Sequence, residues 1–558
     1  MSIRFDEDNQ KLKLDEIRKK EKEDLAGLLA AKSGLPYINL QTYPINPDAL
    51  KILSEEIARK AELVIFDTNS KRVSVAVLSP TNEETKNVLA DLQKQGYDLD
   101  LRVASIESLN KAWERYGELS SSRETEAGSM EISSEEIASL SSKITTIEDV
   151  AVSIKNILSE KKTFRTTKII EIMLAGALAV NASDVHLEPE ESYARLRYRL
   201  DGVLHDILEF DNETFNPILS RIKLVSGLKL NIDNKAQDGR FTVRLGGQEI
   251  EIRTSILPGA YSESIVLRVL NPKSISVPME ELGIEPRLLK ILEREISKPT
   301  GMLLTTGPTG SGKTTTLYAF LKKIHTPEIK IITIENPIEY HLPGIVQTQA
   351  DEEKGYNFID GLRSALRQDP DVIMIGEIRD SETAGVAINS SLTGHLVFST
   401  LHTNTAAGTF PRLIDLGVNS KILTSAINIA MAQRLVRKLC PSCKKEIDVE
   451  GNNKILIDKI IKSISSDVAI ENTSKMWTPV GCEKCNKTGY NGRIGIYEAI
   501  LSDDILEKIL QENPSEREIK KATASQGILD MKQDGILKVL AGTTSLDELK
   551  RVVDLESE

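Results

Sequence analysis

The sequence predicts a multidomain α/β protein in which a domain with a parallel-type sheet follows two smaller α/β domains. From residue 284 onward, apolar runs such as MLLTT and DVIMIGEI alternate with helical segments, which is typical of parallel β–α–β construction. A length of 558 residues favours about three to four domains, since one hydrophobic core does not grow to this size. Two Cys-x-x-Cys pairs add a candidate zinc subdomain.

The N-terminal part of the chain divides into a charged helix, a small domain and a linker. Residues 1–24 are charged throughout and predict a helix, and residues 25–117 predict a small α/β domain. Residues 118–146 are rich in Ser and Glu, which is typical of a flexible or weakly helical linker. The small domain is expected to contain helices over 24–32 and 47–60 and strands over 63–66 and 73–78.

The remaining chain predicts two further α/β domains. Residues 147–275 combine an apolar helix over 154–180 with alternating runs such as ARLRYRLDGVLHDI, which favour strands. Residues 284–558 contain the alternating strands and helices of the parallel-type sheet. A zinc subdomain over 437–497 belongs to this third domain, because all four cysteines lie there.

The composition excludes several classes of protein. With 40% hydrophobic and 28% charged residues, the chain matches ordinary globular proteins, which excludes fibrous and largely disordered classes. Its 71 basic and 83 acidic residues give a net charge of -12, which provides no overall attraction to nucleic acid or to an anionic membrane. We therefore expect no nucleic-acid partner, and contact with a membrane only through other proteins.

The sequence also predicts a location in the cytoplasm. Its first residues, MSIRFDEDNQKLKLDEIRKK, lack the apolar core of a signal peptide. The longest apolar stretch, residues 169–180, is interrupted by Glu171 and is shorter than the roughly 20 residues that cross a bilayer. Neither an export signal nor a membrane span is therefore expected.

The most specific motif is GPTGSGKT at residues 307–314, which matches the pattern G-x-x-x-x-G-K-[ST] of a phosphate-binding loop. An apolar strand-like run precedes it and a helix-like run follows it, as this loop requires. Lys313 would reach the β- and γ-phosphates of ATP, and the hydroxyl of Thr314 would bind Mg²⁺. The alternative is a glycine-rich turn that ends in Lys-Thr by chance. The expected ATP-binding residues are Gly307, Pro308, Thr309, Gly310, Ser311, Gly312, Lys313, Thr314 and Thr315.

Hydrolysis of ATP also needs acidic groups beside this loop. Glu377 follows the apolar run 372–375 and is the candidate Walker B acid, which would hold Mg²⁺ or orient water. Glu335 and Glu339 also follow an apolar strand and are candidates to polarise the attacking water. A solvated surface role is the alternative for each carboxylate, but ligand sites of α/β domains lie at the carboxyl ends of strands.

Two histidines bracket the next predicted strand, in TGHLVFSTLH. His395 and His402 are candidate sensors that would donate a hydrogen bond to the γ-phosphate. The alternative for each is a core or loop histidine whose hydrogen bonds are already satisfied.

Together, these motifs resemble the type II/type IV secretion ATPase superfamily. GPTGSGKT is similar to its Walker A motif, TIENPIEY to its Asp box, RQDPDVIMIGEIRD to its Walker B motif and TGHLVFSTLHTN to its His box. The resemblance is strong over residues 147–500, where it includes SDVHLEP, RYRLDG, QDGRF and RTSILP. GLPYINLQTYPINPDAL resembles the N-terminal domain of the assembly and export branch. A RecA-like P-loop ATPase domain is implied.

The resemblance further implies a homohexamer that powers type IV pilus assembly or type II protein secretion. Arginines approach the γ-phosphate in this family, and Arg253 and Arg268 stand at the matching positions; without the resemblance they are ordinary surface arginines. The implied partners are the cytoplasmic face of an inner-membrane platform protein and other pilus or secretion components. Asn336 departs from the Asp box, which normally has aspartate there, but the flanking glutamates still predict hydrolysis.

The pairs Cys440-Pro-Ser-Cys443 and Cys482-Glu-Lys-Cys485 have the spacing of a zinc site, because four thiolates suit one tetrahedral zinc. Four protein ligands leave no position for water, so the zinc would be structural. The stretch between the pairs exceeds the usual spacing, and residues 450–473 are expected to form an excursion. Four free thiols or a redox pair are the alternatives. Pilus-retraction relatives typically lack this insertion, which favours the assembly or secretion branch.

Two other functions stay open on the sequence alone. A P-loop nucleic-acid translocase can also carry a zinc ribbon, although the acidic charge and the lack of a basic, aromatic stretch argue against it. A non-hydrolysing ATP-binding regulator has Asn336 as its only support. In some relatives, the N-terminal domain binds cyclic di-GMP through paired R-L-G-x-x-L repeats. The chain lacks this pattern, and we expect no such binding.

Overall fold

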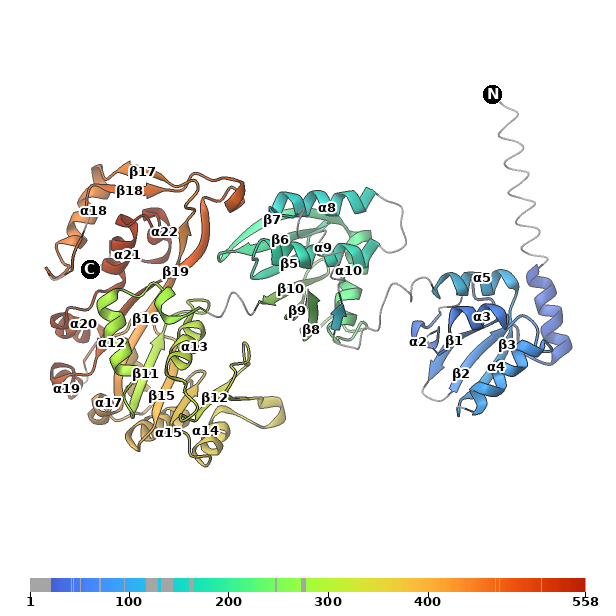
Figure 1. Cartoon of the computed structure of the whole chain (residues 1–558), viewed down its shortest axis with the longest axis horizontal. Helices are drawn as coiled ribbons and strands as arrows, with labels where there is room; N and C mark the ends of the chain where they lie inside the picture. The colour runs from blue at the N-terminus through green and yellow to red at the C-terminus, as the bar shows by residue number, and fades with distance from the viewer. Residues whose placement is uncertain are drawn as a thin grey trace, which may run out of the picture. The chain divides into compact units, whose positions relative to one another are not determined.

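The computed structural model describes residues 22–116, 129–131, 144–159, 165–271 and 277–556, except 42, 44, 51, 70, 71, 95, 246, 247, 467, 471 and 513. The chain forms two units, Met1–Glu126 and Ala127–Glu558 (Figure 1). Their boundary falls in the segment 118–146 that the sequence predicts as a linker. Most of that segment and most of the predicted helix 1–24 lie outside the described residues, but residues 22–33 are helical.

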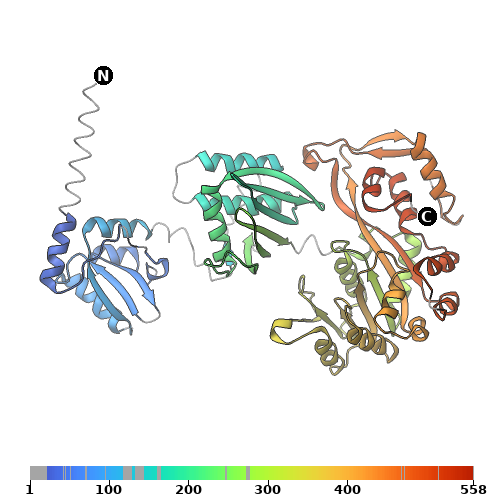
Figure 2. The same ribbon diagram turned by 180° about the vertical axis from the view of Figure 1, so that it is seen from behind.

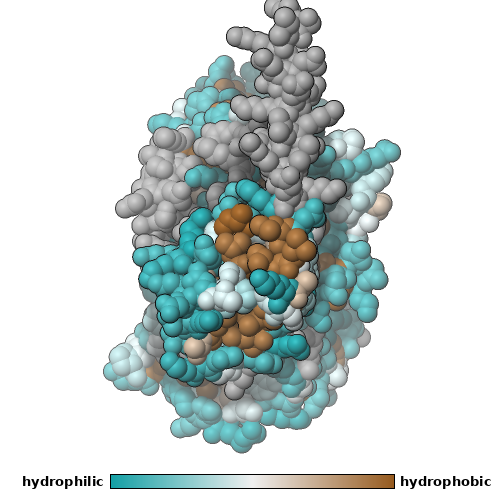
Figure 3. Space-filling view, turned by 90° about the vertical axis from the view of Figure 1, so that its right-hand side faces the viewer, coloured by the Kyte–Doolittle hydropathy of each residue, from teal (hydrophilic) through white to brown (hydrophobic). Residues whose placement is uncertain are grey.

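A three-stranded sheet forms the middle of the first unit. β1 (Leu63–Asn69) pairs antiparallel with β2 (Arg72–Val77), and β2 pairs parallel with β3 (Asp98–Val103). Figure 3 shows apolar side chains gathered on one face of this unit, and Leu25 and Leu28 of helix 22–33 are among its exposed apolar residues. The further helices are α2 (Pro47–Leu50), α3 (Glu55–Lys60), α4 (Glu83–Lys94) and α5 (Ile106–Glu114).

The helix predicted over residues 47–60 is wrong in its extent, because α2 and α3 take its place. The side chain of Ser54 accepts a hydrogen bond from the backbone N–H of Ile57 and so begins α3 as a separate helix. The strands predicted over 63–66 and 73–78 are confirmed as β1 and β2.

The second unit begins with a middle domain (residues 129–131 and 144–270) built on a seven-stranded sheet in the order β4-β8-β9-β10-β5-β6-β7. The pairs are antiparallel except for β4 with β8. Every second residue of β6 is buried, so one face of the sheet covers a core shared with three helices. The elements are β4 (Ser129–Glu131), α8 (Ile147–Ser159), α9 (Arg165–Ala179), β5 (Asp184–Pro189), β6 (Tyr193–Leu200), β7 (Val203–Asp211), α10 (Asn212–Val225), β8 (Gln237–Leu245), β9 (Gln248–Pro258) and β10 (Glu263–Leu270).

The single apolar helix predicted over 154–180 is also wrong, because the structure has two helices there, α8 and α9. They pack closely: an ideal Cβ at Gly176 of α9 would lie 2.6 Å from a methyl group of Val150 in α8. Only glycine permits this approach. Apolar periodicity does not reveal the break, since both helices bury the same kind of side chain.

The parallel-type sheet predicted for the C-terminal domain (residues 277–556) is confirmed, with strand order β13-β12-β14-β15-β11-β16-β19 (Figures 1 and 2). Every neighbouring pair is parallel except the long antiparallel pair of β16 and β19. The strands are β11 (Gly301–Thr306), β12 (Ile331–Glu335), β13 (Val346–Gln349), β14 (Val372–Ile375), β15 (Leu396–Leu401), β16 (Ile427–Leu439) and β19 (Tyr490–Leu501).

Helices cover both faces of this sheet. Met302 and Leu304 of β11 lie in one core with α14 and α15, whereas Leu303 lies in a second core with α12 and α13. Burial on both faces explains why β11, β14 and β15 read as unbroken apolar runs. The helices are α12 (Pro286–Ile296), α13 (Lys313–Ile324), α14 (Phe358–Leu366), α15 (Ser381–Leu392), α16 (Thr409–Asp415), α17 (Ser420–Ala426), α19 (Asp504–Leu510), α20 (Glu516–Thr523), α21 (Met531–Leu540) and α22 (Leu546–Val552).

A small two-stranded sheet interrupts the chain between β16 and β19. β17 (Lys445–Asp448) pairs antiparallel with β18 (Lys475–Thr478), and α18 (Gly451–Ile461) lies between them in sequence. The excursion predicted over 450–473 is therefore present, and it shares a core with α21 and α22. In the part of the chain that the structure describes, no helix combines the length and the apolar character needed to cross a membrane.

The Gly176 contact predicts opposite effects for the same substitution at two helical glycines. Gly176→Ala should lower the free energy of unfolding by about 1–3 kcal/mol, because the added methyl group collides with buried Val150. Gly385→Ala in α15 is the matched control: no heavy atom lies within 4 Å of its ideal Cβ, so helix propensity should raise stability by about 0.5–1 kcal/mol. Native-state hydrogen exchange of each helix measures both, and a stabilised Gly176→Ala variant would contradict the packing.

Candidate nucleotide site and tetracysteine cluster

The P-loop lies at the carboxyl end of β11 and leads into α13. Gly307, Gly310 and Gly312 have φ angles of 148°, 79° and 91°, which side-chain-bearing residues rarely adopt. A Cβ at Gly307 would lie 2.6 Å from the carbonyl oxygen of Gln433 in β16. The buried amide of Gln433 also donates to the carbonyl of Ser311 at 2.8 Å. The neighbouring strand thus fixes the path of the loop.

Lys313 is the first residue of α13, and its ammonium group lies across the loop. Its Nζ donates to the carbonyls of Gly307 at 2.7 Å and Pro308 at 3.2 Å. Burial lowers the pKa of Lys313, while the negative charge of Glu377 acts in the opposite direction. Phosphate oxygens are stronger acceptors than these carbonyls, and the N-terminal end of α13 adds positive charge for them.

A cleft of about 800 Å³ opens over the P-loop, a volume within the range of small-molecule sites. Eight of the predicted ATP-binding residues, Pro308 to Thr315, line it, and Gly307 lies against Gln433 beneath it. Strands β11, β12, β14 and β15 all point their carboxyl ends at this cleft, because they are parallel. The predicted acids Glu335, Glu339 and Glu377 line it too.

Glu377 follows β14 and carries its carboxylate into the cleft with only 13% of its side chain exposed. It pairs with Arg379 at 2.5 Å and with His402 at 3.1 Å. Burial would raise the pKa of Glu377, but the hydrogen bonds from Arg379 and His402 outweigh it and hold the pKa below its ordinary value. Glu377 is therefore an ionised group close to the P-loop, suited to a metal ion or to an ordered water.

Glu335 is the last residue of β12 and is almost fully buried. Its carboxylate accepts hydrogen bonds from the hydroxyls of Tyr318 and Thr333 and, at 3.1 Å, from the amide of Gln347. Burial raises the pKa of Glu335 against the effect of these hydrogen bonds. Three partners therefore hold this carboxylate at the base of the cleft.

The two predicted arginines come from the middle domain. On β9, Arg253 donates to Glu339 at 3.1 Å and to the carbonyl of Ile338 at 2.5 Å. On β10, Arg268 lines the cleft, pairs with Asp184 at 3.1 Å and keeps 58% of its side chain exposed. Both arginines thus lie next to predicted site residues, although they are remote from them in the sequence.

The two predicted histidines lie at opposite ends of β15. His402 follows the carboxyl end, lines the cleft and bonds to Glu377. His395 precedes the strand, and its Nδ1 bonds to the carbonyl of Ser390 at 3.1 Å instead. The structure therefore does not bring His395 to the P-loop, because a strand of six residues separates the two edges of the sheet. The structure therefore favours the alternative interpretation of His395, a loop histidine whose hydrogen bonds are satisfied.

Four further arginines that the sequence analysis does not name as site residues also line the cleft. Arg434 lies beside Gln433 on β16, and its Nη2 donates to the side-chain oxygen of Asn404 at 3.1 Å. Burial lowers its pKa. Two of the four had a sequence signal: Arg199 lies within RYRLDG, and Arg434 is the single arginine of the apolar run INIAMAQRLV. Arg493 and Arg551 lie in none of the motifs described above. The four are Arg199, Arg434, Arg493 and Arg551.

The four cysteines meet at one point between β16 and β19. Their sulfur atoms all lie within 4.8 Å of one another. The Cys440–Cys482, Cys443–Cys485 and Cys482–Cys485 sulfur distances are 3.9, 3.8 and 3.7 Å. Four sulfurs at about 2.3 Å from a tetrahedral zinc lie roughly 3.8 Å apart, so the cluster fits this ion. The backbone N–H groups of Cys482 and Gly489 also point at the sulfur of Cys485.

Replacing one cysteine should empty this site. For Cys482→Ser, we expect the zinc content of the purified chain to fall from about one ion to a small fraction, because zinc binds four thiolates far better than three and a hydroxyl. Plasma mass spectrometry measures the ion directly. Ser442→Ala, between Cys440 and Cys443, is exposed and should keep its zinc. A wild-type chain purified without zinc, with a disulfide in its place, would support the redox alternative.

Comparison with known proteins gives a consistent set of relatives. The family model for Type II/IV secretion system protein matches residues 159–551, and that for the MshEN domain matches residues 33–123. The chain is 36% identical over 535 residues to the type IV pilus assembly ATPase PilB of Myxococcus xanthus, which covers 95% of this chain and 91% of that protein. It is 35% identical over 514 residues to the type II secretion system ATPase E of Vibrio cholerae, covering 91% and 98%.

Among solved structures, the Legionella pneumophila ATPase DotB is similar with a TM-score of 0.51 and 23% sequence identity. The alignment covers 70% of this chain and 97% of that one. At this identity, the similarity shows a shared fold and nothing about function. The expected absence of cyclic di-GMP binding stays a prediction.

Proposed function

This chain belongs to the type II/IV secretion system protein family, and we propose that it is the hexameric ATP-driven motor of a type IV pilus assembly machine or a type II secretion machine. The family model covers most of the chain, and relatives from both kinds of machine match it over nearly its whole length. ATP hydrolysis is the activity of this family.

The observation that carries the proposal is the meeting of Lys313, Glu377 and His402 in one cleft over the P-loop. These residues follow three different strands of one parallel sheet. A cation for phosphate oxygens thus lies near an ionised carboxylate, as phosphoryl transfer to water requires.

Each residue has a proposed part in hydrolysis. The P-loop and Lys313 would bind the β- and γ-phosphates, and Thr314 and Glu377 would hold Mg²⁺, which neutralises phosphate charge. We assign the orientation of the attacking water to Glu339, because Glu335 is committed to three neighbours whereas Glu339 has 32% of its side chain exposed. Release of Glu339 from Arg253 would then accompany activation.

A hexamer gives the exposed arginines a role. Arg268 is 58% exposed and already lies at the rim of the cleft. Its guanidinium would stabilise charge on the γ-phosphate when subunits pack together, as would that of Arg253. We further propose a structural zinc at the cysteine cluster, and a place at the cytoplasmic face of the inner membrane against a platform protein. These partners are proposed from the machines in which the relatives are named.

Glu377→Gln tests the reaction. Turnover should fall by about a hundredfold to a thousandfold, because a neutral amide does not stabilise Mg²⁺ or order water as a carboxylate does. Binding of ADP should change little. Glu382→Gln is the matched control, since Glu382 is exposed and pairs with Arg363 on the surface. Phosphate release and calorimetric ADP titration are the measurements, and undiminished turnover in Glu377→Gln would refute the assignment.

The proposed platform-protein partner predicts which macromolecule stimulates ATP hydrolysis. Adding the cytoplasmic domain of a pilus or secretion platform protein should raise ATP hydrolysis severalfold, whereas single- or double-stranded DNA should leave it unchanged, given the net charge of -12. Stimulation by DNA and not by the platform domain would favour the translocase function.

A further inference from the structure

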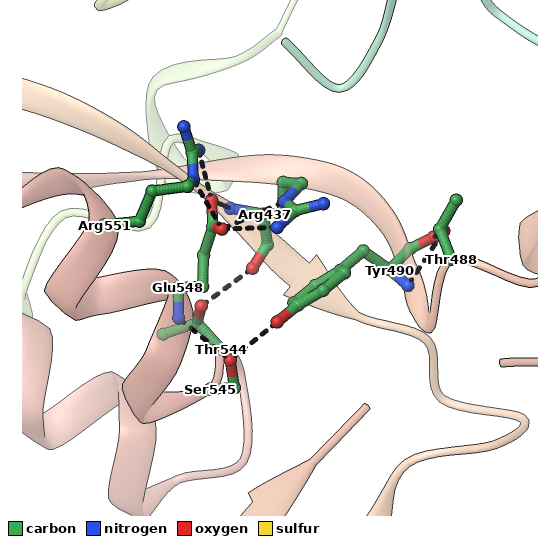
Figure 4. Close-up of polar contacts among 7 residues, drawn as sticks. All are labelled: Arg437, Thr488, Tyr490, Thr544, Ser545, Glu548 and Arg551. Atoms are coloured by element: carbon green, nitrogen blue, oxygen red, sulfur yellow. Dashed lines mark hydrogen bonds and ion pairs between the residues drawn. The ribbon is translucent and has the colours of Figure 1, made fainter. Parts of the chain in front are cut away.

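Arg551 lies at the rim of the nucleotide cleft although it is distant in sequence from the P-loop. It belongs to α22, near the C-terminal end of the described chain. Its Nη2 and Nε donate to the two carboxylate oxygens of Glu548 at 2.6 and 2.9 Å (Figure 4). This two-pronged pair fixes the plane of the guanidinium, and Figure 4 shows one of its nitrogens pointing away from Glu548.

Glu548 is fully buried and serves a second arginine. Its carboxylate accepts hydrogen bonds from the Nε and Nη2 of Arg437 at 3.0 and 2.7 Å and from the Arg437 backbone N–H at 3.1 Å. Two guanidinium groups on one carboxylate leave a net positive charge. Because 49% of the Arg551 side chain is exposed, that charge is available at the cleft.

The group formed by Arg437, Glu548 and Arg551 is also connected to the tetracysteine site. The Arg437 guanidinium lies 4.0 Å from the ring centre of Tyr490, and the Tyr490 hydroxyl bonds to Ser545 at 2.7 Å. Tyr490 follows the second cysteine pair: its backbone N–H donates to Thr488, whose hydroxyl donates to the carbonyl of Cys485 at 2.6 Å. Fixed hydrogen bonds thus run from the cysteine cluster to α22 and Arg551.

The strand order indicates which end of a nucleotide meets Arg551. Glu377 and His402 follow β14 and β15, on one side of β11, whereas Glu548 binds Arg437 of β16, on the other side. The γ-phosphate must face Glu377 for hydrolysis. The α-phosphate and ribose therefore extend from the P-loop toward β16 and α22.

We propose that Arg551 binds the α-phosphate end of the nucleotide and that Glu548 is the positioning residue that ties Arg551 to the tetracysteine subdomain. The proposal rests on the ATP site proposed above. A guanidinium held by one carboxylate retains donors for phosphate oxygens, and its fixed plane reduces the entropy lost on binding.

The test is calorimetric titration of the full-length chain with ADP and ATP. Arg551→Ala should weaken both nucleotides about tenfold, the size of a lost charge-assisted hydrogen bond. In turnover assays its KM for ATP should rise by a similar factor, with kcat reduced less than about twofold. Lys550→Ala, one residue earlier, is the matched control: Lys550 bonds to Asn453 and should bind ADP like the wild type.

Glu548→Gln tests the positioning role. It should weaken ADP binding severalfold, and adding Arg551→Ala should cost little more, because the two changes disable one unit. If Glu548→Gln lowers the melting temperature, Tyr490→Phe is the milder variant, since it removes only the hydroxyl bonded to Ser545. It should weaken ADP binding about twofold to threefold and lower the melting temperature less than Glu548→Gln does, because it removes one neutral hydrogen bond and leaves both arginines paired with Glu548.

The outcomes separate this inference from the proposed function. Wild-type ADP affinity in Arg551→Ala overturns the inference while Glu377→Gln still tests hydrolysis. Equal losses in Arg551→Ala and Lys550→Ala, or a loss matched by a lower melting temperature, would mean that α22 is only structural. A chain that binds neither ADP nor ATP would refute the proposed ATP site itself.

Discussion

The parallel pairing of β11 with β15, β15 with β14 and β14 with β12 is the constraint on which the site depends. It brings four carboxyl strand ends to one edge, so that residues separated by almost a hundred positions meet there. Lys313, Glu377 and His402 lie at this edge because each follows its own strand. The same constraint excludes His395, which precedes β15 and so lies at the opposite edge.

A second constraint comes from β16, which links the two candidate sites of the C-terminal domain. Gln433 fixes the P-loop and Arg434 enters the cleft, while Arg437, further along the strand, holds Glu548, and Cys440 follows the strand directly. A shift of β16 relative to β11 would therefore change the P-loop and the cysteine cluster together. Strand β19 pairs with β16 over most of its length, which resists such a shift.

The sequence locates residues whose chemistry is encoded locally, but it does not reveal residues whose role depends on tertiary contacts. The P-loop, Glu377 and the cysteine pairs were predictable because residues of fixed spacing perform one task. The break between α8 and α9 was missed, since both helices are apolar. Arg551 and Glu548 were missed because they meet Arg437 and the cleft only when α22 packs beside β16. The two histidines were treated alike because a motif does not state which end of a strand faces the ligand.

The three carboxylates of the cleft differ in environment, and this difference argues for distinct roles. Burial raises the pKa of Glu335, whereas Arg379 and His402 hold that of Glu377 low. The negative charge of Glu339 also raises the pKa of Glu335. An aspartate at position 336, between them in the sequence, would raise the pKa of Glu335 further. A neutral Asn336 avoids that repulsion and leaves Glu377 as the ionised group for a metal. The departure at Asn336 is therefore compatible with hydrolysis, because the groups assigned to it do not depend on a charge at that position.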